Sequence, residues 1–161
     1  MSPHERRAFA AVVDRLNSLG HATVPASFTD SNNPALRFDL PLPGLLDSPK
    51  LTAVIAPIDA EEGSISILVP NIGTDLGDAE DSDRLRAWAL NVNYSSIYVR
   101  VGIDSRDGEI RFISVLPAAS LSEDRLSEVI GEIGEVAMEY LTIIALRHRE
   151  PLPANAPVRF E

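Results

Sequence analysis

The sequence predicts an α+β fold in which a twisted, five-stranded antiparallel sheet packs against helices. Three segments repeat apolar residues at steps of three and four, which is typical of amphipathic helices. Five other segments are rich in apolar residues, and three of them alternate apolar and polar residues, which is typical of strands with one buried face. Glycine, proline and acidic residues separate the segments. The expected order is therefore helix, three strands, helix, two strands and helix.

The first helix is expected to begin after Ser2 and to end at Gly20. Ser2 and Glu5 have the spacing of a capping box, and Pro3 suits the first helical position. A single apolar stripe follows, and it consists of Phe9, Val12, Val13, Leu16 and Leu19.

The first three strands are expected at residues 36–40, 51–56 and 65–69. Residues 36–40 alternate, and the prolines of residues 40–44 end that strand because proline has no N–H to donate. An acidic turn separates the other two segments, so we expect them to pair as a hairpin.

The middle helix is expected to start near Ser82 and to end around Asn91 and Asn93. We expect the acidic stretch from Asp75 to Asp83 to be an exposed loop. Calcium binding is the alternative interpretation. However, an EF-hand loop needs its glycine after the first acids, and Gly77 comes before most of them.

The last hairpin and the final helix follow. Asp107-Gly108 is a strong turn signal between strands expected at residues 97–103 and 110–116. Ser122 is the expected cap of the final helix, and the basic residues 147–149 suit its negative end. The two apolar residues around that cap have the spacing of a hydrophobic staple, and they are Leu121 and Leu126.

Two features of the helices have two interpretations each. Trp88 on the middle helix is either a core residue or an aromatic anchor of an interface. Four glutamates of the final helix form a ridge of one charge, which is either a solvent face or a docking site for a basic partner. The ridge consists of Glu128, Glu132, Glu135 and Glu139.

Composition excludes several kinds of site and partner. The chain has 161 residues, which suits one domain, and it has no cysteine for disulfides, thiolate metal sites or thiol catalysis. Its net charge of −10 disfavours nucleic acid as a partner. The first residues lack the apolar run of a secretory signal, and no segment is apolar enough to span a membrane, so we expect a cytoplasmic protein.

A resemblance to known families lies in the central part of the chain. Its residues are Asn91 and Asn93, the run YVRVGIDSRDGEIRF from Tyr98 to Phe112, Leu116-Pro117 and the Leu121-Ser122 entry into a long helix. This stretch resembles the YbjN-type family of sensory transduction regulators. The order of elements resembles the type III secretion chaperone-like fold.

The resemblance implies that residues 1–149 form one type III secretion chaperone-like domain, with residues 150–161 as a loose proline-rich tail. It also implies a homodimer with partner-binding surfaces and no active site. In related chaperones the middle helix contributes to dimerisation. That role would place Leu85, Trp88 and Val92 near a two-fold axis.

No catalytic, cofactor-binding or metal-binding residue is predicted. None of the three histidines, His4, His21 and His148, has a second metal ligand at helical spacing, and His148 is expected to contact the last carbonyls of the final helix. No nucleophile elbow, phosphate-binding loop or dinucleotide fingerprint is present. Carboxylates alone could supply acid–base catalysis, but no spacing places two of them in a pocket.

We therefore expect a non-enzymatic module, either chaperone-like or a regulatory adaptor, that forms a homodimer and binds another protein. The outer face of the sheet and the first helix are the expected binding surfaces. A small-molecule-sensing regulator with a pocket between sheet and helices is the alternative, and a hydrolase that uses carboxylates alone is a third class. Neither nucleic acid nor a membrane is expected as a partner.

Overall fold

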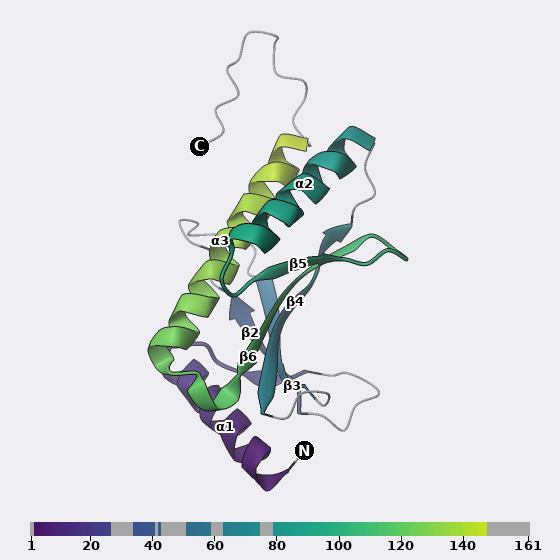
Figure 1. Cartoon of the computed structure of the whole chain (residues 1–161). Coiled ribbons are helices and arrows are strands. Elements are labelled where there is room, and N and C mark those ends of the chain that lie inside the picture. Colours follow the sequence, from purple (N-terminus) through teal and green to yellow (C-terminus); the bar gives the residue numbers. More distant parts are fainter. Residues whose placement is uncertain are drawn as a thin grey trace.

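Three helices cover one face of a curled antiparallel sheet (Figure 1). The computed structural model describes residues 2–26, 34–40, 42, 51–58, 63–74 and 79–147. The helical elements are α1 (Pro3–Ser18), α2 (Ala79–Ser95), the short 3-10 helix η1 (Ala118–Ser120) and α3 (Glu123–Arg147). The strands are β1 (Val24–Pro25), β2 (Leu36–Leu40), β3 (Leu51–Pro57), β4 (Ser64–Thr74), β5 (Arg100–Ile103) and β6 (Glu109–Pro117).

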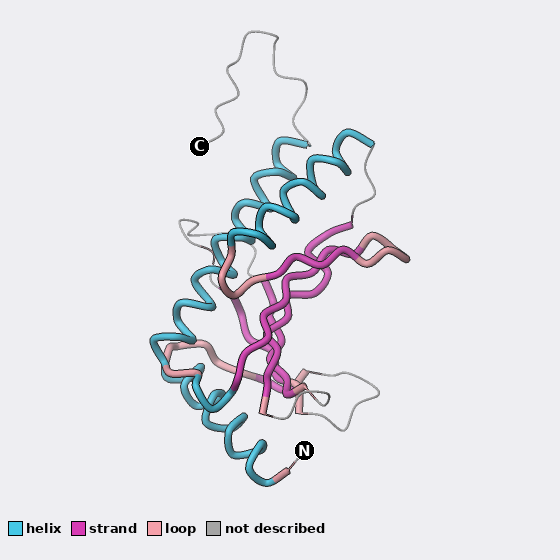
Figure 2. The backbone as a smooth tube through the Cα atoms, in the orientation of Figure 1, coloured by secondary structure: helices cyan, strands magenta, loops and turns pink. Residues whose placement is uncertain are grey.

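The strands of the sheet lie in the order β1-β2-β3-β4-β6-β5, and all neighbouring pairs are antiparallel. Figure 2 shows the strands in magenta and the helices in cyan. The predicted α+β class and the three helices are confirmed. The predicted count of five strands is wrong, because in the described part of the chain Val24 and Pro25 add a sixth strand beside β2. A strand of two residues is too short to show alternation, so the sequence pattern could not reveal it.

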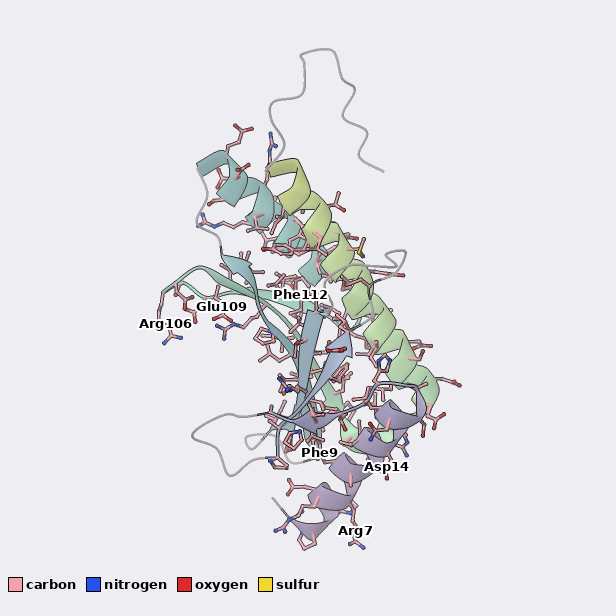
Figure 3. All side chains as sticks on the ribbon, turned by 180° about the vertical axis from the view of Figure 1, so that it is seen from behind. Arg7, Phe9, Asp14, Arg106, Glu109 and Phe112 are labelled. Carbon is pink, nitrogen blue, oxygen red and sulfur yellow. The ribbon has the colours of Figure 1, made fainter. Side chains whose placement is uncertain are left out.

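The core lies between the helices and one face of the sheet. Every second residue of a strand projects to that face and is buried against the helices. On β6, for example, Phe112 is buried and its neighbours Arg111 and Ile113 are only partly buried. Phe9 of α1 belongs to the same core (Figure 3). The largest fully buried side chains include Leu16, Ile55, Ile67, Leu126, Ile133 and Tyr140.

Capping residues fix two of the helix starts as the sequence predicted. Ser2 and Glu5 form the capping box of α1, with the Ser2 Oγ accepting from the Glu5 N–H at 3.2 Å. Ser122 caps α3 by accepting from the Arg125 N–H at 3.2 Å. The predicted start of α2 near Ser82 is wrong, because the helix begins at Ala79 and contains part of the acidic stretch.

Strand β4 has an irregular stretch where it crosses under α3. Val69 pairs with Phe112 and Gly73 pairs with Ile110, so β4 has extra residues here relative to β6. Pro70 lies in this stretch, where a missing N–H is tolerated because the ladder is already interrupted. Beyond it, Gly73 lies directly under the side chain of Tyr140.

Some predictions fall on residues outside the described part of the chain. These are the acidic turn at 59–62, residues 75–78 of the acidic stretch, and most of the proline-containing segment 41–50. His148, Arg149 and the proline-rich tail 150–161 also lie outside it.

Candidate functional site

The residues predicted for a dimer axis on α2 lie against the interior of the chain. Leu85 and Val92 are buried and belong to the hydrophobic core, and Trp88 is partly buried against it. Because the fold itself occupies these side chains, they do not form a contact surface. The dimer stays a prediction, but a contact through α2 would have to use a different face of the helix.

Trp88 joins α2 to α3 and the sheet. Its ring lies 5.8 Å from that of Tyr140 and 6.1 Å from that of Phe112, measured between centroids. The indole Nε1–H donates to Glu139 Oε2 at 2.9 Å. Aromatic contacts of this kind stabilise a core, and the polar edge of the ring is satisfied. Of the two interpretations, the structure supports Trp88 as a core residue.

The glutamate ridge of α3 faces α2 and the connection between α2 and β5. Glu132 accepts hydrogen bonds from the backbone N–H of Ile97 at 2.8 Å and from that of Tyr98 at 3.2 Å. Glu128 accepts from the Tyr98 hydroxyl at 3.0 Å. Partial burial and then the bond to Glu128 raise the pKa of Tyr98. With Glu139, three of the four glutamates therefore bind groups of the chain itself, an arrangement that neither interpretation of the ridge included.

Asn93 fastens the end of α2 to strand β5. Its Oδ1 accepts from the Val101 N–H at 2.6 Å, and its Nδ2 donates to the Val101 carbonyl at 3.0 Å. Strand β5 lies at the edge of the sheet and has a neighbouring strand on one side only. The Asn93 side chain therefore binds the outward N–H and C=O of Val101 in the way that a second neighbouring strand would. Asn93 therefore acts as a structural clamp.

The opposite face of α2 carries an exposed apolar stripe. Ala87 is exposed, Leu90 is 70% exposed, Tyr94 is 93% exposed, and Ile97 just after the helix is 75% exposed. The steps of three and four residues align Ala87, Leu90 and Tyr94 along one side of the helix, and Ile97 follows two residues after the helix ends at Ser95. We call these four residues the α2 stripe. The apolar spacing of the stripe is visible in the sequence. The interface prediction instead uses the core-facing side of α2, because Leu85, Ala89 and Val92 form the more regular apolar pattern.

The outer face of the sheet, which points away from the helices, carries a second ordered set of residues. Register pairs Arg37 with Val54, Val54 with Leu68, Leu68 with Ile113, and Ile113 with Arg100. Directly paired residues project to the same face, so these five side chains form one line across five strands. We call this line the outer row. It depends on pairing between distant segments, which a single sequence does not reveal.

A cluster of charges lies at the tip of the β5–β6 hairpin (Figure 3). Asp104 forms ion pairs with Arg106 at 2.8 Å and Arg111 at 3.4 Å, and Arg111 also contacts Glu109 at 3.0 Å. The hydrogen bond from the Arg106 side chain is the main cause that holds the pKa of Asp104 well below its usual range. The tip contains the predicted Asp107-Gly108 turn, where Gly108 has φ +72°. These contacts order the hairpin.

The described residues contain no group of three or more His, Asp or Glu side chains that could hold a metal ion. The ring of His21 lies against Phe38, with 5.8 Å between centroids. None of the described helices combines the length and the apolar character that crossing a membrane requires.

Comparison with known proteins identifies a similar fold. No family model matches the chain, and no curated protein matches it. An uncharacterised protein from Methanothermobacter thermautotrophicus has a crystal structure that is similar, with a TM-score of 0.57. The match covers 87% of this chain and 98% of that chain at 12% sequence identity. At that identity the likeness shows the fold alone.

Proposed function

We propose that this protein is a non-enzymatic protein-binding module, chaperone-like or a regulatory adaptor, that acts as a homodimer. The observation that carries the proposal is the α2 stripe, because large apolar side chains aligned on a helix surface are typical of contact sites. The resemblance to YbjN-type proteins and to the type III secretion chaperone-like fold agrees with this role and is part of the proposal.

The α2 stripe suits a contact between two copies of the same helix. When two such helices cross antiparallel about a two-fold axis near Val92, Leu90 of one copy faces Tyr94 of the other, and Ala87 faces Ile97. In the second pair a small side chain opposes a larger one, and in the first pair two large apolar side chains meet. The proposed two-fold axis still passes by α2, as the sequence predicts. The side chains proposed to make the contact are now those of the α2 stripe, in place of Leu85, Trp88 and Val92.

Molar mass in solution tests the dimer. The chain has a mass of 17.5 kDa, so light scattering at a low and a high protein concentration distinguishes one copy from two. Leu90→Glu should give the monomer at concentrations at which the wild type is a dimer, because the variant places a charge in the centre of the contact. Val115→Glu is the matched control, since Val115 is also apolar and 50% exposed but lies on the sheet. A monomeric wild type at the high concentration would contradict the dimer.

A small-molecule sensor is the alternative function, and it requires a pocket between the sheet and the helices. At the centre of that interface the rings of Trp88, Phe112 and Tyr140 contact one another. A thermal-shift screen of metabolites tests this alternative, because a ligand at 100 times its Kd stabilises the folded state by about 2.7 kcal/mol. A reproducible shift with one compound would favour the sensor.

A further inference from the structure

The two ends of the outer row are arginines whose charge meets no carboxylate in the described part of the chain. Arg37 is exposed, and no described residue forms a hydrogen bond or ion pair with it. Arg100 donates from Nη1 to the carbonyl oxygens of Ser96 at 2.9 Å and Val99 at 2.8 Å. In a chain with a net charge of −10, two such arginines on one face form a local site of opposite sign.

The middle of the outer row is apolar. Val54 is 7% exposed although it lies outside the main core, and Leu68 and Ile113 are half-buried. In the next row Val115 pairs with Ser66, and Val115 is half-exposed. An apolar centre with a charged rim has the composition of a protein-binding surface.

The charges near the outer row define where an acidic group would bind. Asp39 shares the outer face of β2 with Arg37, but it pairs with Thr52 one row away. Arg111 lies one row from Arg100 on the same face, and its charge is already paired with Asp104 and Glu109. An acidic ligand is therefore attracted to the ends of the outer row.

We propose that the outer row binds an extended segment of a partner protein, in which two acidic residues flank apolar ones. Four strand spacings separate Arg37 from Arg100, which is about 19 Å. In an extended segment, positions 1 and 7 project to the same side and lie about 20 Å apart, and positions 3 and 5 project with them. Acids at 1 and 7 then reach the arginines, and apolar residues at 3 and 5 cover Leu68 and Ile113, the half-buried residues of the centre. This inference rests on the proposed protein-binding function and specifies the partner.

Short labelled peptides test the inference by fluorescence anisotropy. The probe is Glu-Thr-Leu-Thr-Leu-Thr-Glu, and its controls have lysine at both ends or have the second glutamate moved to position 5. The probe should bind at least tenfold more tightly than the lysine-ended peptide. Its affinity should fall with added salt, because exposed ion pairs are screened.

Charge reversal on the protein locates the site. Arg37→Glu should weaken probe binding by about fivefold, as expected for one exposed ion pair. It should also improve binding of Lys-Thr-Leu-Thr-Leu-Thr-Glu, which restores an opposite charge at that end. Arg7→Glu on α1 is the matched control, because it changes the net charge equally at an exposed position far from the sheet (Figure 3).

Three results would overturn the inference. They are equal binding of acid-ended and lysine-ended peptides, equal binding by the wild type and Arg37→Glu, and loss of the dimer in Arg37→Glu, which would assign the outer row to a second copy. Failure of the dimer is a separate result, because it is read from molar mass and from Leu90→Glu. A monomer that binds the probe with the stated specificity would refute the dimer and support this inference.

Discussion

Replacing Gly73 by alanine should destabilise the protein strongly for a reason that is purely steric. A Cβ at position 73 would lie 1.9 Å from the Tyr140 hydroxyl oxygen and 3.1 Å from the carbon that bears it. Tyr140 is buried, and Phe112 and Trp88 contact its ring, so the ring cannot move aside freely. Overpacking of this kind costs about 1–3 kcal/mol, and we expect Gly73→Ala to lie at the upper end of that range.

Urea unfolding of a double-mutant cycle measures this clash. Tyr140→Phe removes the oxygen that the new Cβ would meet, so Gly73→Ala should cost at least 1 kcal/mol less in that background, about the size of a typical coupling between contacting residues. Gly131→Ala is the control, because its Cβ would point into open space on helix α3. That change should stabilise the protein by about 0.5–1 kcal/mol, since alanine is the better helix former. A Gly73→Ala variant as stable as the wild type would refute the predicted clash.

Three further predictions concern polar groups. Asn93→Ala should lower the free energy of unfolding in urea by about 1–3 kcal/mol, because both backbone groups of Val101 lose their partner; no loss would show that the clamp is dispensable. Ser114→Ala should leave that free energy unchanged or raise it by about 1 kcal/mol, since no described residue forms a hydrogen bond with the buried Ser114 Oγ; a clear loss would reveal a partner. The pKa of Asp104 is lowered in the folded state, so the folded state binds fewer protons there and the contribution to stability is lost as pH falls below the usual value of 3.8. NMR titration should find the carboxylate still ionised at that pH, and a midpoint at 3.8 would contradict the bond to Arg106.

The features predicted correctly are those that local sequence determines. The capping box at Ser2, the cap at Ser122 and the turn at Asp107-Gly108 each depend on residues a few positions apart. The sequence prediction places the start of α2 too late, because it assigns Glu80 and Asp81 to a loop. Acids are in fact favourable in the first turn of a helix, so the same residues also support the earlier start.

The surfaces were harder to predict because they depend on how distant segments pack. The glutamates of α3 could be recognised as a ridge, but their acceptor role depends on α2 and residues 97–98 lying beside that ridge. Arg37 and Arg100 are 63 residues apart in the sequence, and only strand register places them in one row. The α2 stripe is different, since Leu90 and Tyr94 lie one turn apart and their spacing was visible in the sequence.

The α2 stripe and the outer row face opposite directions, because α2 packs on the helical side of the sheet and the row lies on the other side. A dimer formed through α2 would therefore leave both outer rows accessible and would present two binding sites to one partner. Linking two sites raises avidity without any new contact, provided that the linker spans them. Leu90→Glu should then leave the affinity for a single probe peptide unchanged while it weakens binding of two probe peptides joined by a long flexible linker. Equal loss for the single and the joined peptides would show that the two surfaces are coupled, and would refute their independence.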